Sequence, residues 1–491
     1  MSDELDRLRA EIDAIDEKIV TLLGERMAVS AAIGGYKRAH GLPILSAGRE
    51  RAVLDRVSAQ AGPALAGYAE TVFRTIMACS RDCQKLRCGL VGMPLRHSFS
   101  PAIHAKLADY EYQLYELTED QLGPFLREKR FDGLNITIPY KITAMAYCDA
   151  LTEQARHVGC VNTIVRRADG TLLGHNTDYD GFCYLLQSTG TEVRGKKALV
   201  LGNGGASATV QAVLRDLGTA EIILVSRQGE TNYQNLYAHT DAELLVNTTP
   251  VGMYPNTGAS PVELIRLPGL KTVLDVIYNP AKTQLLLDAE KRGIKAANGL
   301  SMLVAQAKAA AECFTGRPID GAVIEDIRRD IERSTKNILL IGMPGCGKTT
   351  VGRALAEATG RAFVDLDELV EQRAGKPIPA IFAAGGEEAF RALEHAALCE
   401  HAKRSGLVIA CGGGVVTRAE NLDPMRQNAV VVWLLRDLDK LPTDGRPLSL
   451  AQPMEALFQQ REPLYRAAAD STVDNNGPVA DTVRQILEAV L

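Results

Sequence analysis

A glycine-rich turn between an apolar run and a helical pattern constrains this chain most. Residues Gly342 to Thr349 read Gly-Met-Pro-Gly-Cys-Gly-Lys-Thr and directly follow the apolar run Asn337 to Ile341. The turn matches G-x-x-x-x-G-K-[ST], in which the backbone amides cradle phosphate oxygens. That motif joins a parallel strand to a helix. We therefore expect an α/β domain with a parallel sheet from about residue 334 to 491, and a non-nucleotide role for this turn is the weaker alternative.

The motif also assigns roles within the turn. Lys348 is expected to reach the β- and γ-phosphates of ATP, and Thr349 to ligate Mg²⁺. The residues expected to line the nucleotide are Gly345, Cys346, Gly347, Lys348, Thr349 and Thr350.

A second glycine-rich turn lies earlier in the chain. The expected strand Lys197 to Leu201 leads into Gly202-Asn203-Gly204-Gly205-Ala206, and a helix is expected from about Ala208. This is the setting of a dinucleotide-binding (Rossmann) domain. The next expected strand, Glu221 to Val225, ends in Ser226-Arg227, where an NAD-binding protein usually offers an acidic residue. An arginine there favours NADP, whose 2′-phosphate it can pair with, over the alternative of a surface arginine.

The first 86 residues have a helical pattern. Leu5, Leu8, Ile12, Ile15, Ile19 and Leu22 recur every three or four residues, and Arg26, Val29 and Ile33 continue the same face. An arginine in this register needs an anionic partner. The pattern predicts an all-α bundle, and it leaves two interpretations open: a cationic pocket for a small dianion, or a salt-bridged coiled coil.

Length and charge limit the remaining possibilities. At 491 residues the chain should hold several domains, and its net charge of −5 argues against a nucleic-acid binder. No apolar run approaches the roughly 18 residues of a membrane span. Ten cysteines without a C-x-x-C pair indicate reduced thiols, and we expect a cytoplasmic protein. The expected domains are 1–86, 87–333 and 334–491, the middle one divided into 87–190 with 300–333 and a nucleotide part at 191–299.

The first segment resembles the all-helical chorismate mutases. The matching stretches are LRAEIDAID, ERMAV, Lys37, RER at Arg49 to Arg51, and SRDCQ. The resemblance implies a homodimer through this domain and a pocket that binds chorismate. Lys37 and Gln84 would act in catalysis, and the substrate would be bound by Arg9, Arg26, Ser46, Arg49, Glu50 and Ser80.

The middle segment resembles shikimate dehydrogenase. The motifs are GMPLRHSFSPAIH, GLNITIPYK, GCVNTI, GHNTDYDG and NGLSMLVAQ, in this order. The resemblance implies a catalytic pair of Lys141 and Asp178. The implied substrate-binding residues are Ser98, Ser100, Asn135, Thr137, Asn162, Tyr278 and Gln306, and the implied further NADP(H) contacts are Thr248, Ile277 and Gly299.

The last segment resembles shikimate kinase through VDLD, IFAAGGEEAFRALE, CGGGVV, RPLS and REPLY. The resemblance implies that Asp365 helps to hold Mg²⁺ and that Asp367 accepts a hydrogen bond from the reacting hydroxyl. Arg391, Gly413 and Arg461 would bind shikimate, and Arg446 would approach ATP from a lid. The stretch between Trp433 and Arg446 is shorter than this family leads us to expect, and it shows no obvious second arginine for the nucleotide.

Together these features predict a multifunctional enzyme of aromatic biosynthesis. It would reduce 3-dehydroshikimate with NADPH, phosphorylate shikimate with ATP and Mg²⁺, and rearrange chorismate to prephenate. Its partners would be these small molecules. The alternative is a bifunctional dehydrogenase and kinase whose N-terminal domain only binds chorismate or prephenate, as a regulatory and dimerisation domain.

Overall fold

The computed structural model describes residues 2–95, 98–441 and 453–490, and it divides into two compact units. Unit 1 comprises Met1–Thr152, Val161–His175 and Ala310–Pro318. Unit 2 comprises Glu153–Cys160, Asn176–Ala309 and Ile319–Leu491. None of the described helices is long and apolar enough to cross a membrane.

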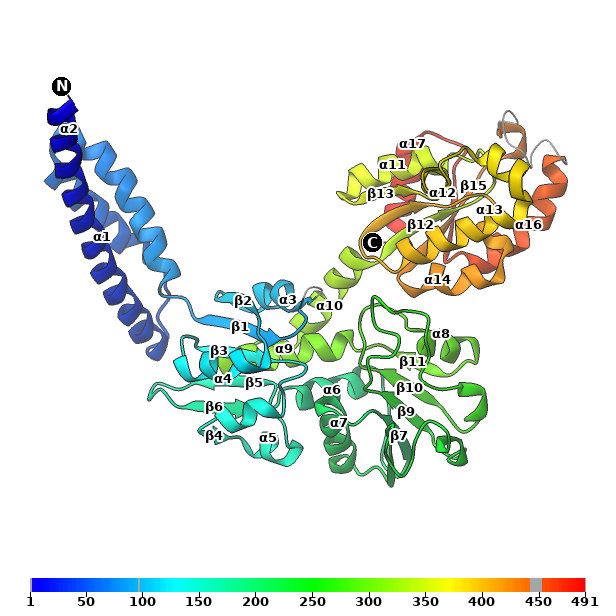
Figure 1. Ribbon diagram of the computed structural model, residues 1–491, viewed down its shortest axis with the longest axis horizontal. Helices are drawn as coiled ribbons and strands as arrows, with labels where there is room; N and C mark the ends of the chain where they lie inside the picture. The colour runs from blue at the N-terminus through cyan, green and yellow to red at the C-terminus, as the bar shows by residue number, and fades with distance from the viewer. Residues whose placement is uncertain (1, 96–97, 442–452, 491) are drawn as a thin grey trace. The chain divides into compact units, whose positions relative to one another are not determined.

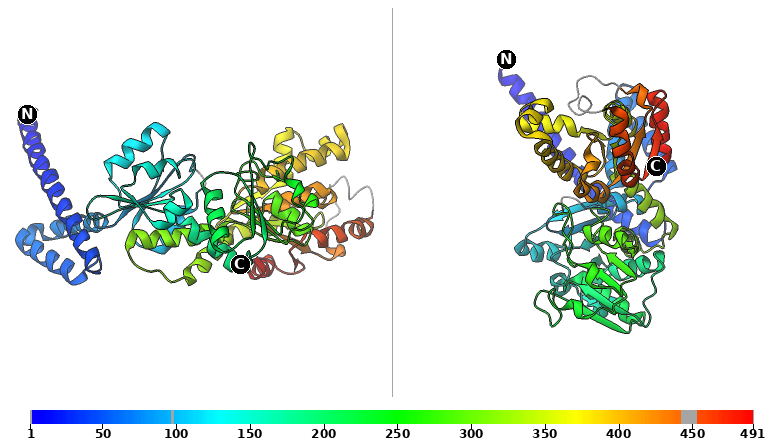
Figure 2. Two further views of the ribbon diagram at one scale, coloured as in Figure 1. Left: turned by 90° about the horizontal axis from the view of Figure 1, so that it is seen from below. Right: turned by 90° about the vertical axis from the view of Figure 1, so that its right-hand side faces the viewer.

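Unit 1 begins with the expected helices. Helix α1 spans Ser2–Ala39 and helix α2 spans Ala47–Asp82. Helix α2 bends at Gly62, whose φ of 71° is accessible to glycine at little cost, and Pro63 follows it. Figure 2 shows the two arms of α2 on either side of this bend. The all-helical prediction for this segment is therefore confirmed.

The other part of unit 1 is a mixed six-stranded sheet in the order β2-β1-β3-β5-β6-β4 (Figure 1). Its strands are β1 Arg87–Gly92, β2 Glu111–Glu116, β3 Gly133–Ile136, β4 Ala150–Leu151, β5 Thr163–Arg166 and β6 Leu172–His175. Strand β5 pairs antiparallel with both β3 and β6, whereas β1 runs parallel to β2 and β3. Helices α3 (Ser100–Leu107) and α4 (Glu119–Glu128) connect the first three strands, and α5 (Glu153–Val158) belongs to unit 2.

Unit 2 contains a parallel five-stranded sheet in the order β11-β10-β9-β7-β8. Its strands are β7 Lys197–Leu201, β8 Glu221–Val225, β9 Leu244–Asn247, β10 Thr272–Asp275 and β11 Lys295–Ala297. The helices with them are α6 Asp178–Ser188, α7 Gly205–Asp216, α8 Gln284–Lys291 and α9 Leu300–Thr315, of which the residues from Ala310 on belong to unit 1. The predicted Rossmann-type α/β domain is confirmed. The predicted start of α7 near Ala208 is wrong by three residues, because Gly204 takes the N-cap.

The second parallel sheet of unit 2 has the order β13-β14-β12-β15-β16. Its strands are β12 Asn337–Ile341, β13 Ala362–Asp365, β14 Leu407–Ala410, β15 Ala429–Leu435 and β16 Ser471–Asp474. The helices are α11 Lys348–Thr359, α12 Leu366–Ala374, α13 Ile378–Ala402, α14 Leu422–Gln427, α16 Met454–Ala468 and α17 Val479–Val490. The parallel sheet expected from the glycine-rich turn is confirmed, with β12 at its centre.

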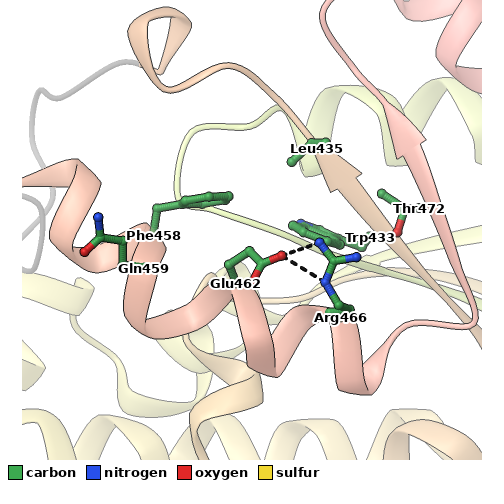
Figure 3. A pocket seen from close by; sticks show the side chains of 7 residues that line it. All are labelled: Trp433, Leu435, Phe458, Gln459, Glu462, Arg466 and Thr472. Atoms are coloured by element: carbon green, nitrogen blue, oxygen red, sulfur yellow. Dashed lines mark hydrogen bonds and ion pairs between the residues drawn. The ribbon is translucent and has the colours of Figure 1, made fainter.

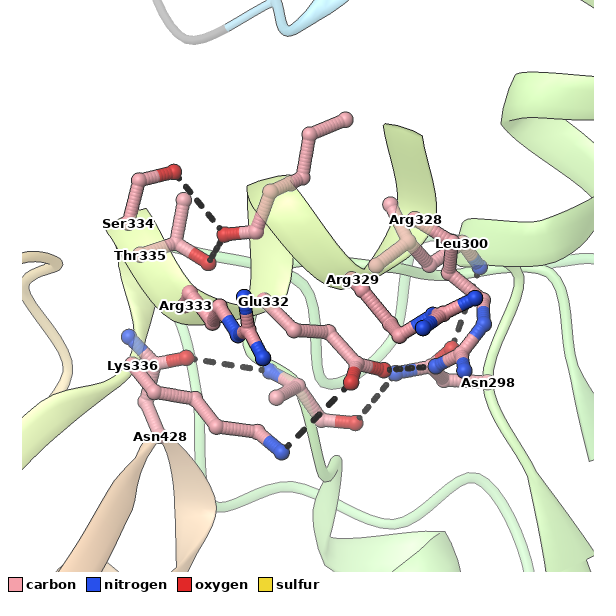
Figure 4. A network of polar contacts seen from close by, with 12 residues as sticks. Asn298, Leu300, Arg328, Arg329, Glu332, Arg333, Ser334, Thr335, Lys336 and Asn428 are labelled. Carbon is pink, nitrogen blue, oxygen red and sulfur yellow. Dashed lines mark hydrogen bonds and ion pairs between the residues drawn. The ribbon is translucent and has the colours of Figure 1, made fainter. Parts of the chain in front are cut away.

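Helix α10 (Ala322–Thr335) precedes β12 directly and carries a row of ion pairs (Figure 4). Glu332 lies between Arg328 and Lys336, with N···O distances of 2.6 and 3.8 Å. Elsewhere in unit 2, Asp423 on α14 accepts hydrogen bonds from Gln284 and Lys291 on α8, at 2.8 and 2.6 Å. The two parallel sheets of unit 2 are thus linked by side chains as well as by the chain itself.

Candidate active sites

The first polar cluster lies where α1 meets the last turns of α2. Arg26 on α1 donates a hydrogen bond to the Ser80 hydroxyl, and Gln84 is buried one turn beyond Ser80. The Gln84 amide nitrogen donates to the Ser80 carbonyl at 3.1 Å, while its Oε1 is buried without a partner among the described residues. The helices can meet here because position 34 is glycine, where a Cβ would lie 2.8 Å from Gln84 Cα. This cluster offers a cation and an unsatisfied acceptor to a polar ligand.

The other predicted residues of this segment lie at different positions. Lys37 is half-buried and donates to the Ile44 carbonyl at 2.5 Å. Glu50 accepts from Arg81 at 2.5 Å across the bend of α2. Ser46 and Arg49 are exposed at the start of α2. Arg9 is exposed and pairs with Asp6 at 3.2 Å. Seventeen residues of helix separate Arg9 from Arg26, a rise of about 26 Å, so both cannot contact one small ligand within a single chain.

A buried hydrogen-bonded chain crosses the mixed sheet of unit 1. The Tyr112 hydroxyl donates to Asn135 Oδ1 at 2.7 Å, and Asn135 Nδ2 donates to the Thr163 hydroxyl at 3.1 Å. Thr163 in turn donates to Asn162 Oδ1 at 3.2 Å. The chain brings together two predicted residues, Asn135 and Asn162, and fixes the orientation of their amides. Tyr112 was not predicted from the sequence. The feature that could have indicated it is its position on β2, the strand that pairs with β1.

The two predicted serines stand together at the start of α3. The Ser98 hydroxyl accepts from the Ser100 backbone amide at 3.2 Å, and Ser100 is buried. Thr137 lies just after β3, and its amide donates to the Val91 carbonyl at 2.9 Å. Lys141 follows in the next loop and is half-buried. Unit 1 thus supplies hydroxyl, amide and ammonium groups from adjoining segments.

His104 is buried close to this chain of hydrogen bonds. Its ring stacks on Tyr112 with centroids 3.9 Å apart, and Nδ1 lies 2.5 Å from the Tyr110 hydroxyl. Burial lowers the pKa of His104 to about 3, so the ring is neutral at physiological pH. A neutral, stacked imidazole supports the positions of Tyr112 and Asn135.

The remaining residues predicted for this substrate lie in unit 2. Asp178 is buried at the first turn of α6, and Gln306 is buried on α9, where its Nε2 donates to the Leu303 carbonyl at 2.9 Å. A Cβ at Gly181 would lie 3.0 Å from Gln306 Cβ, so the glycine lets α6 and α9 approach closely. Burial raises the pKa of Tyr278.

The predicted dinucleotide residues converge at one edge of the first parallel sheet. Strands β8 and β9 flank β7 on opposite sides, so the chain reverses its winding direction beside β7. Open α/β sheets bind ligands at the carboxyl ends of the strands at such a switch point. Gly202 follows β7 with a φ of 102°, and a Cβ there would lie 2.9 Å from the Thr248 hydroxyl. Glycine is therefore required for the turn that opens this edge.

Each strand end at this edge contributes predicted residues. Asn203, Gly204, Gly205 and Ala206 form the start of α7. Ser226 is buried after β8, and Arg227 beside it is exposed. Thr248 follows β9 and donates to the Leu201 carbonyl at 2.6 Å. Ile277 follows β10 and accepts a backbone hydrogen bond from Gly299 at 3.0 Å. The helix N-terminus, the open turn and the nearby guanidinium fit a phosphorylated dinucleotide.

A buried carboxylate supports this edge, and sequence reasoning missed it. Asp275, the last residue of β10, is fully buried and accepts hydrogen bonds from three groups. They are the Thr283 hydroxyl at 2.7 Å, Asn247 Nδ2 at 3.0 Å and the Ile277 amide at 3.1 Å. Burial raises the pKa of Asp275 to about 6, although these donors oppose the shift. Asp275 thereby fixes the loop that carries Ile277 and Tyr278.

The phosphate-binding turn lies between β12 and α11. Gly345 and Gly347 have φ angles of 82° and 96°, a conformation that favours glycine and turns amides toward one point. Lys348 is buried and donates to the carbonyls of Gly342 and Met343, at 2.9 and 3.0 Å. Cys346 is fully buried, so it fills the turn, while Thr350 is exposed on α11. The turn has the form required to bind a nucleoside triphosphate.

Two carboxylates flank this turn. The Thr349 hydroxyl donates to Asp365 Oδ2 at 2.7 Å, and Asp365 Oδ1 accepts from the Asp367 amide at 3.0 Å. A hydroxyl and a carboxylate beside phosphate oxygens are ligands that Mg²⁺ accepts, with water completing its coordination. Among the described residues no group of three His, Cys, Asp or Glu could hold a metal by itself. Thr349 and Asp365 therefore fit a Mg²⁺ that arrives with the nucleotide.

A cationic cluster follows on α13 and α16. Arg391 is buried and pairs with Glu394 at 2.7 Å and with Glu387 at 3.0 Å. Burial raises the pKa of Glu394, and the Arg391 charge opposes this shift. Arg461, also buried, donates to the Gly413 carbonyl at 3.1 Å. A Cβ on either neighbour of Gly413, at residue 412 or 414, would collide with Glu394 or Arg391 respectively. The glycine run thus leaves room for the two charged side chains in the positions they occupy.

Arg446, which is predicted to approach ATP, lies outside the described residues. An open groove of about 510 Å³ lies between α16 and β15 and is lined by Trp433, Phe458 and the Glu462–Arg466 pair, among others (Figure 3). It contains none of the predicted residues.

The middle region of the chain is similar to known proteins. A family model described as shikimate dehydrogenase substrate binding domain matches residues 90–164. The shikimate dehydrogenase (NADP(+)) of Clostridium beijerinckii is 34% identical over 268 residues, which cover 50% of this chain and 98% of that protein. The chain belongs to the shikimate dehydrogenase family. The family member from Caldanaerobacter subterraneus is 36% identical over 273 residues, covering 50% of this chain and 96% of that protein.

Segments on both sides of the shikimate dehydrogenase region match other families. A model of type II chorismate mutase matches residues 8–85, and a model of shikimate kinase matches residues 344–491. A solved chorismate mutase/shikimate 5-dehydrogenase fusion protein from Clostridium acetobutylicum is 34% identical. It covers 50% of this chain and 97% of its own, with a TM-score of 0.48. The three family models show that the chain combines chorismate mutase, shikimate dehydrogenase and shikimate kinase domains.

Proposed function

We propose that this chain catalyses NADPH-dependent reduction of 3-dehydroshikimate, ATP-dependent 3-phosphorylation of shikimate, and rearrangement of chorismate to prephenate. The observation that supports this proposal most strongly is that each region matched to a family contains polar groups that can be assigned to its reaction. The product of the first reaction is the substrate of the second, so two of the three activities act in sequence.

In the dehydrogenase, substrate recognition is assigned to fixed polar groups. Ser98 and Ser100 would bind the substrate carboxylate, and Asn135 and Asn162, whose amides are oriented by Tyr112 and Thr163, would bind its hydroxyls. The remaining contacts would come from Thr137, Tyr278 and Gln306. NADPH, when bound, supplies the hydride, and the 2′-phosphate is assigned to Arg227. Lys141 and Asp178 would deliver the proton to the forming hydroxyl.

In the kinase, the substrate carboxylate is assigned to Arg391 and Arg461. Arg391 is held by ion pairs with Glu394 and Glu387, which restrict the orientation of its guanidinium. Asp367 would accept the hydrogen bond of the attacking hydroxyl. Lys348, released from the loop carbonyls, would stabilise charge on the transferred phosphoryl group. Thr349 and Asp365 would hold Mg²⁺.

In the mutase, the reaction needs no nucleophile, because one molecule rearranges through a cyclic transition state. Arg26, Lys37 and Gln84 would hold the reactive conformer and stabilise charge on the breaking ether bond. The match to type II chorismate mutase favours this catalytic role over a purely regulatory domain.

We also infer a homodimer formed through α1. Its apolar stripe is exposed in the single chain, with Leu5, Ile12, Ile19 and Leu22 between 49% and 62% exposed. Large exposed apolar stripes mark interfaces. A second copy of α1 would cover the stripe, and it would place the partner's Arg9 within reach of a pocket that the Arg9 of the same chain cannot reach. Replacing Ile12 and Ile19 by glutamate should halve the mass measured by light scattering and lower mutase activity, and an unchanged mass would contradict the dimer.

The cellular compartment is inferred from the thiols. All ten cysteines are free in the structure, which supports a reducing environment such as the cytoplasm.

The test of the proposed function is a set of three assays on the full chain. With 3-dehydroshikimate, NADPH, ATP and Mg²⁺, the protein should oxidise NADPH and form shikimate 3-phosphate; with chorismate alone it should form prephenate. Lys37→Ala should abolish chorismate turnover and leave the other two assays unchanged. If Lys37→Ala leaves chorismate turnover unchanged but shifts dehydrogenase or kinase kinetics, the N-terminal domain is a regulator.

A further inference from the structure

Arg436 lies beside the phosphate-binding turn and belongs to none of the sites assigned above. It directly follows β15, which pairs with β12, the strand that leads into the turn. A Cβ at Gly342 would lie 2.6 Å from the Leu434 carbonyl, so the end of β15 runs against the start of the turn. A Cβ at Gly347 would lie 3.7 Å from Arg436 Nη1. The guanidinium therefore stands next to the N-cap of α11, where the phosphate-facing amides converge.

The guanidinium has no partner within the part of the chain that the structure describes. Its Nε is buried and makes no hydrogen bond, and the side chain is half-buried. A buried polar nitrogen without a partner destabilises the folded chain, and a charged one does so more strongly. An anionic oxygen of a ligand would satisfy it.

The nearby acidic and amide side chains are already engaged with one another. The Asp437 carboxylate accepts from Asn476 Nδ2 at 3.1 Å and from Lys440 Nζ at 2.8 Å. Asn475 donates to the Cys346 carbonyl at 2.5 Å, which ties the loop after β16 to the same turn. Arg436 thus stands beside Gly347 of the turn, and none of these side chains pairs with its charge. An anion at the turn would supply the missing partner.

We propose that Arg436 binds the phosphate chain of ATP, as a second cation beside Lys348. The proposal rests on the kinase assignment above. The stretch from 437 to 452, which follows Arg436, contains a single arginine, Arg446. Arg436 would therefore supply the second arginine for the nucleotide that this stretch lacks. A guanidinium can donate two parallel hydrogen bonds to a phosphate, which an ammonium cannot. Stacking of Arg436 on the adenine ring is the competing role, and binding measurements separate the two.

The test compares Arg436→Ala, Arg436→Gln and Arg436→Lys with the wild-type chain. A charge-assisted contact to phosphate predicts that the Ala and Gln variants raise the KM for ATP about tenfold to a hundredfold. The KM for shikimate should stay within about twofold, and Lys should restore part of the loss. By calorimetry, ATP and ADP should bind more weakly to Arg436→Ala while adenosine binds as before.

Controls keep the outcome interpretable. Arg353→Ala removes an exposed arginine on α11 that pairs with Glu368 at 2.7 Å, and it should leave the KM for ATP unchanged. Fluorescence of Trp433, the single tryptophan, reports whether each variant keeps its kinase fold, and Arg436→Gln serves if the Ala variant does not fold.

Two results would overturn the proposal. The first is an unchanged KM for ATP in folded Arg436→Ala or Arg436→Gln. The second is a loss of adenosine affinity equal to the loss for ATP, which would place Arg436 on the base. A wild-type chain that fails to phosphorylate shikimate would instead overturn the kinase assignment.

Discussion

Replacing Asp275 by asparagine should make the dehydrogenase nucleotide domain more stable at neutral pH. Asp275 is a fully buried carboxylate that accepts three hydrogen bonds within unit 2. Asparagine has the same shape. Its Oδ1 can accept from Asn247 and Ile277, and one amide N–H can donate to the Thr283 hydroxyl, which also accepts from the Leu286 amide at 3.4 Å. The substitution therefore removes a buried charge and keeps three hydrogen bonds to this side chain, while the second amide N–H and the Thr283 hydroxyl hydrogen lose an acceptor and offset part of the gain.

The magnitude follows from the pKa. Burial raises the pKa of Asp275 from 3.8 to about 6, so the folded domain binds this proton more tightly than the unfolded chain does. The contribution of Asp275 to stability therefore falls as pH rises from about 4 to about 6. Above that window the buried charge lowers the free energy of unfolding by about 3 kcal/mol, from 1.36 kcal/mol for each unit between the unfolded and folded pKa values. Between pH 5 and pH 7 the expected loss is about 1 kcal/mol.

The assay must report this domain separately from the kinase. Pulse-labelled hydrogen exchange along a urea series, read in peptides from β9 and β10, measures unfolding of the nucleotide sheet. From pH 5 to pH 7 the free energy of unfolding of this domain should fall by about 1 kcal/mol in the wild-type chain through Asp275. The Asp275→Asn variant should not show that decrease. The Trp433 fluorescence transition should be the same in both proteins. Equal pH dependence in both proteins, or a variant that is less stable at pH 7, would refute the argument.

Two further predictions address catalysis. Arg227→Ala should raise the KM for NADPH far more than that for NADH, because about 2 kcal/mol of charge-assisted binding to the 2′-phosphate is lost; wild-type protein that uses both cofactors equally well would contradict this. Lys141→Ala and Lys348→Ala should each lower the rate of one reaction at least about a hundredfold, since each removes a charge contact in a transition state. The dehydrogenase and kinase assays, run in parallel with the mutase assay, check that each variant spares the other two reactions.

The sequence alone predicted the classes of fold and the strands that lead into the two glycine-rich turns. The strand before each glycine-rich turn was predicted with the observed bounds, at Lys197–Leu201 and Asn337–Ile341. The helical pattern of the first segment was likewise confirmed. These features are local: an apolar run, a periodic stripe or a required glycine acts through neighbouring residues of the chain. The start of α7 was predicted three residues too late, because Gly204 takes the N-cap and the helix begins at Gly205.

Only the tertiary structure decided which side chains become partners. Asp275 meets Asn247 from another strand, and Glu394 orients Arg391 while forcing glycine at residue 412. Arg436 reaches Gly347 because β15 lies beside β12, although 89 residues separate the two positions in the chain. Burial of charge, the direction of each pKa shift and the satisfaction of each donor depend on such contacts between distant segments. A pattern read along the chain shows which groups are present; packing determines what each of them faces.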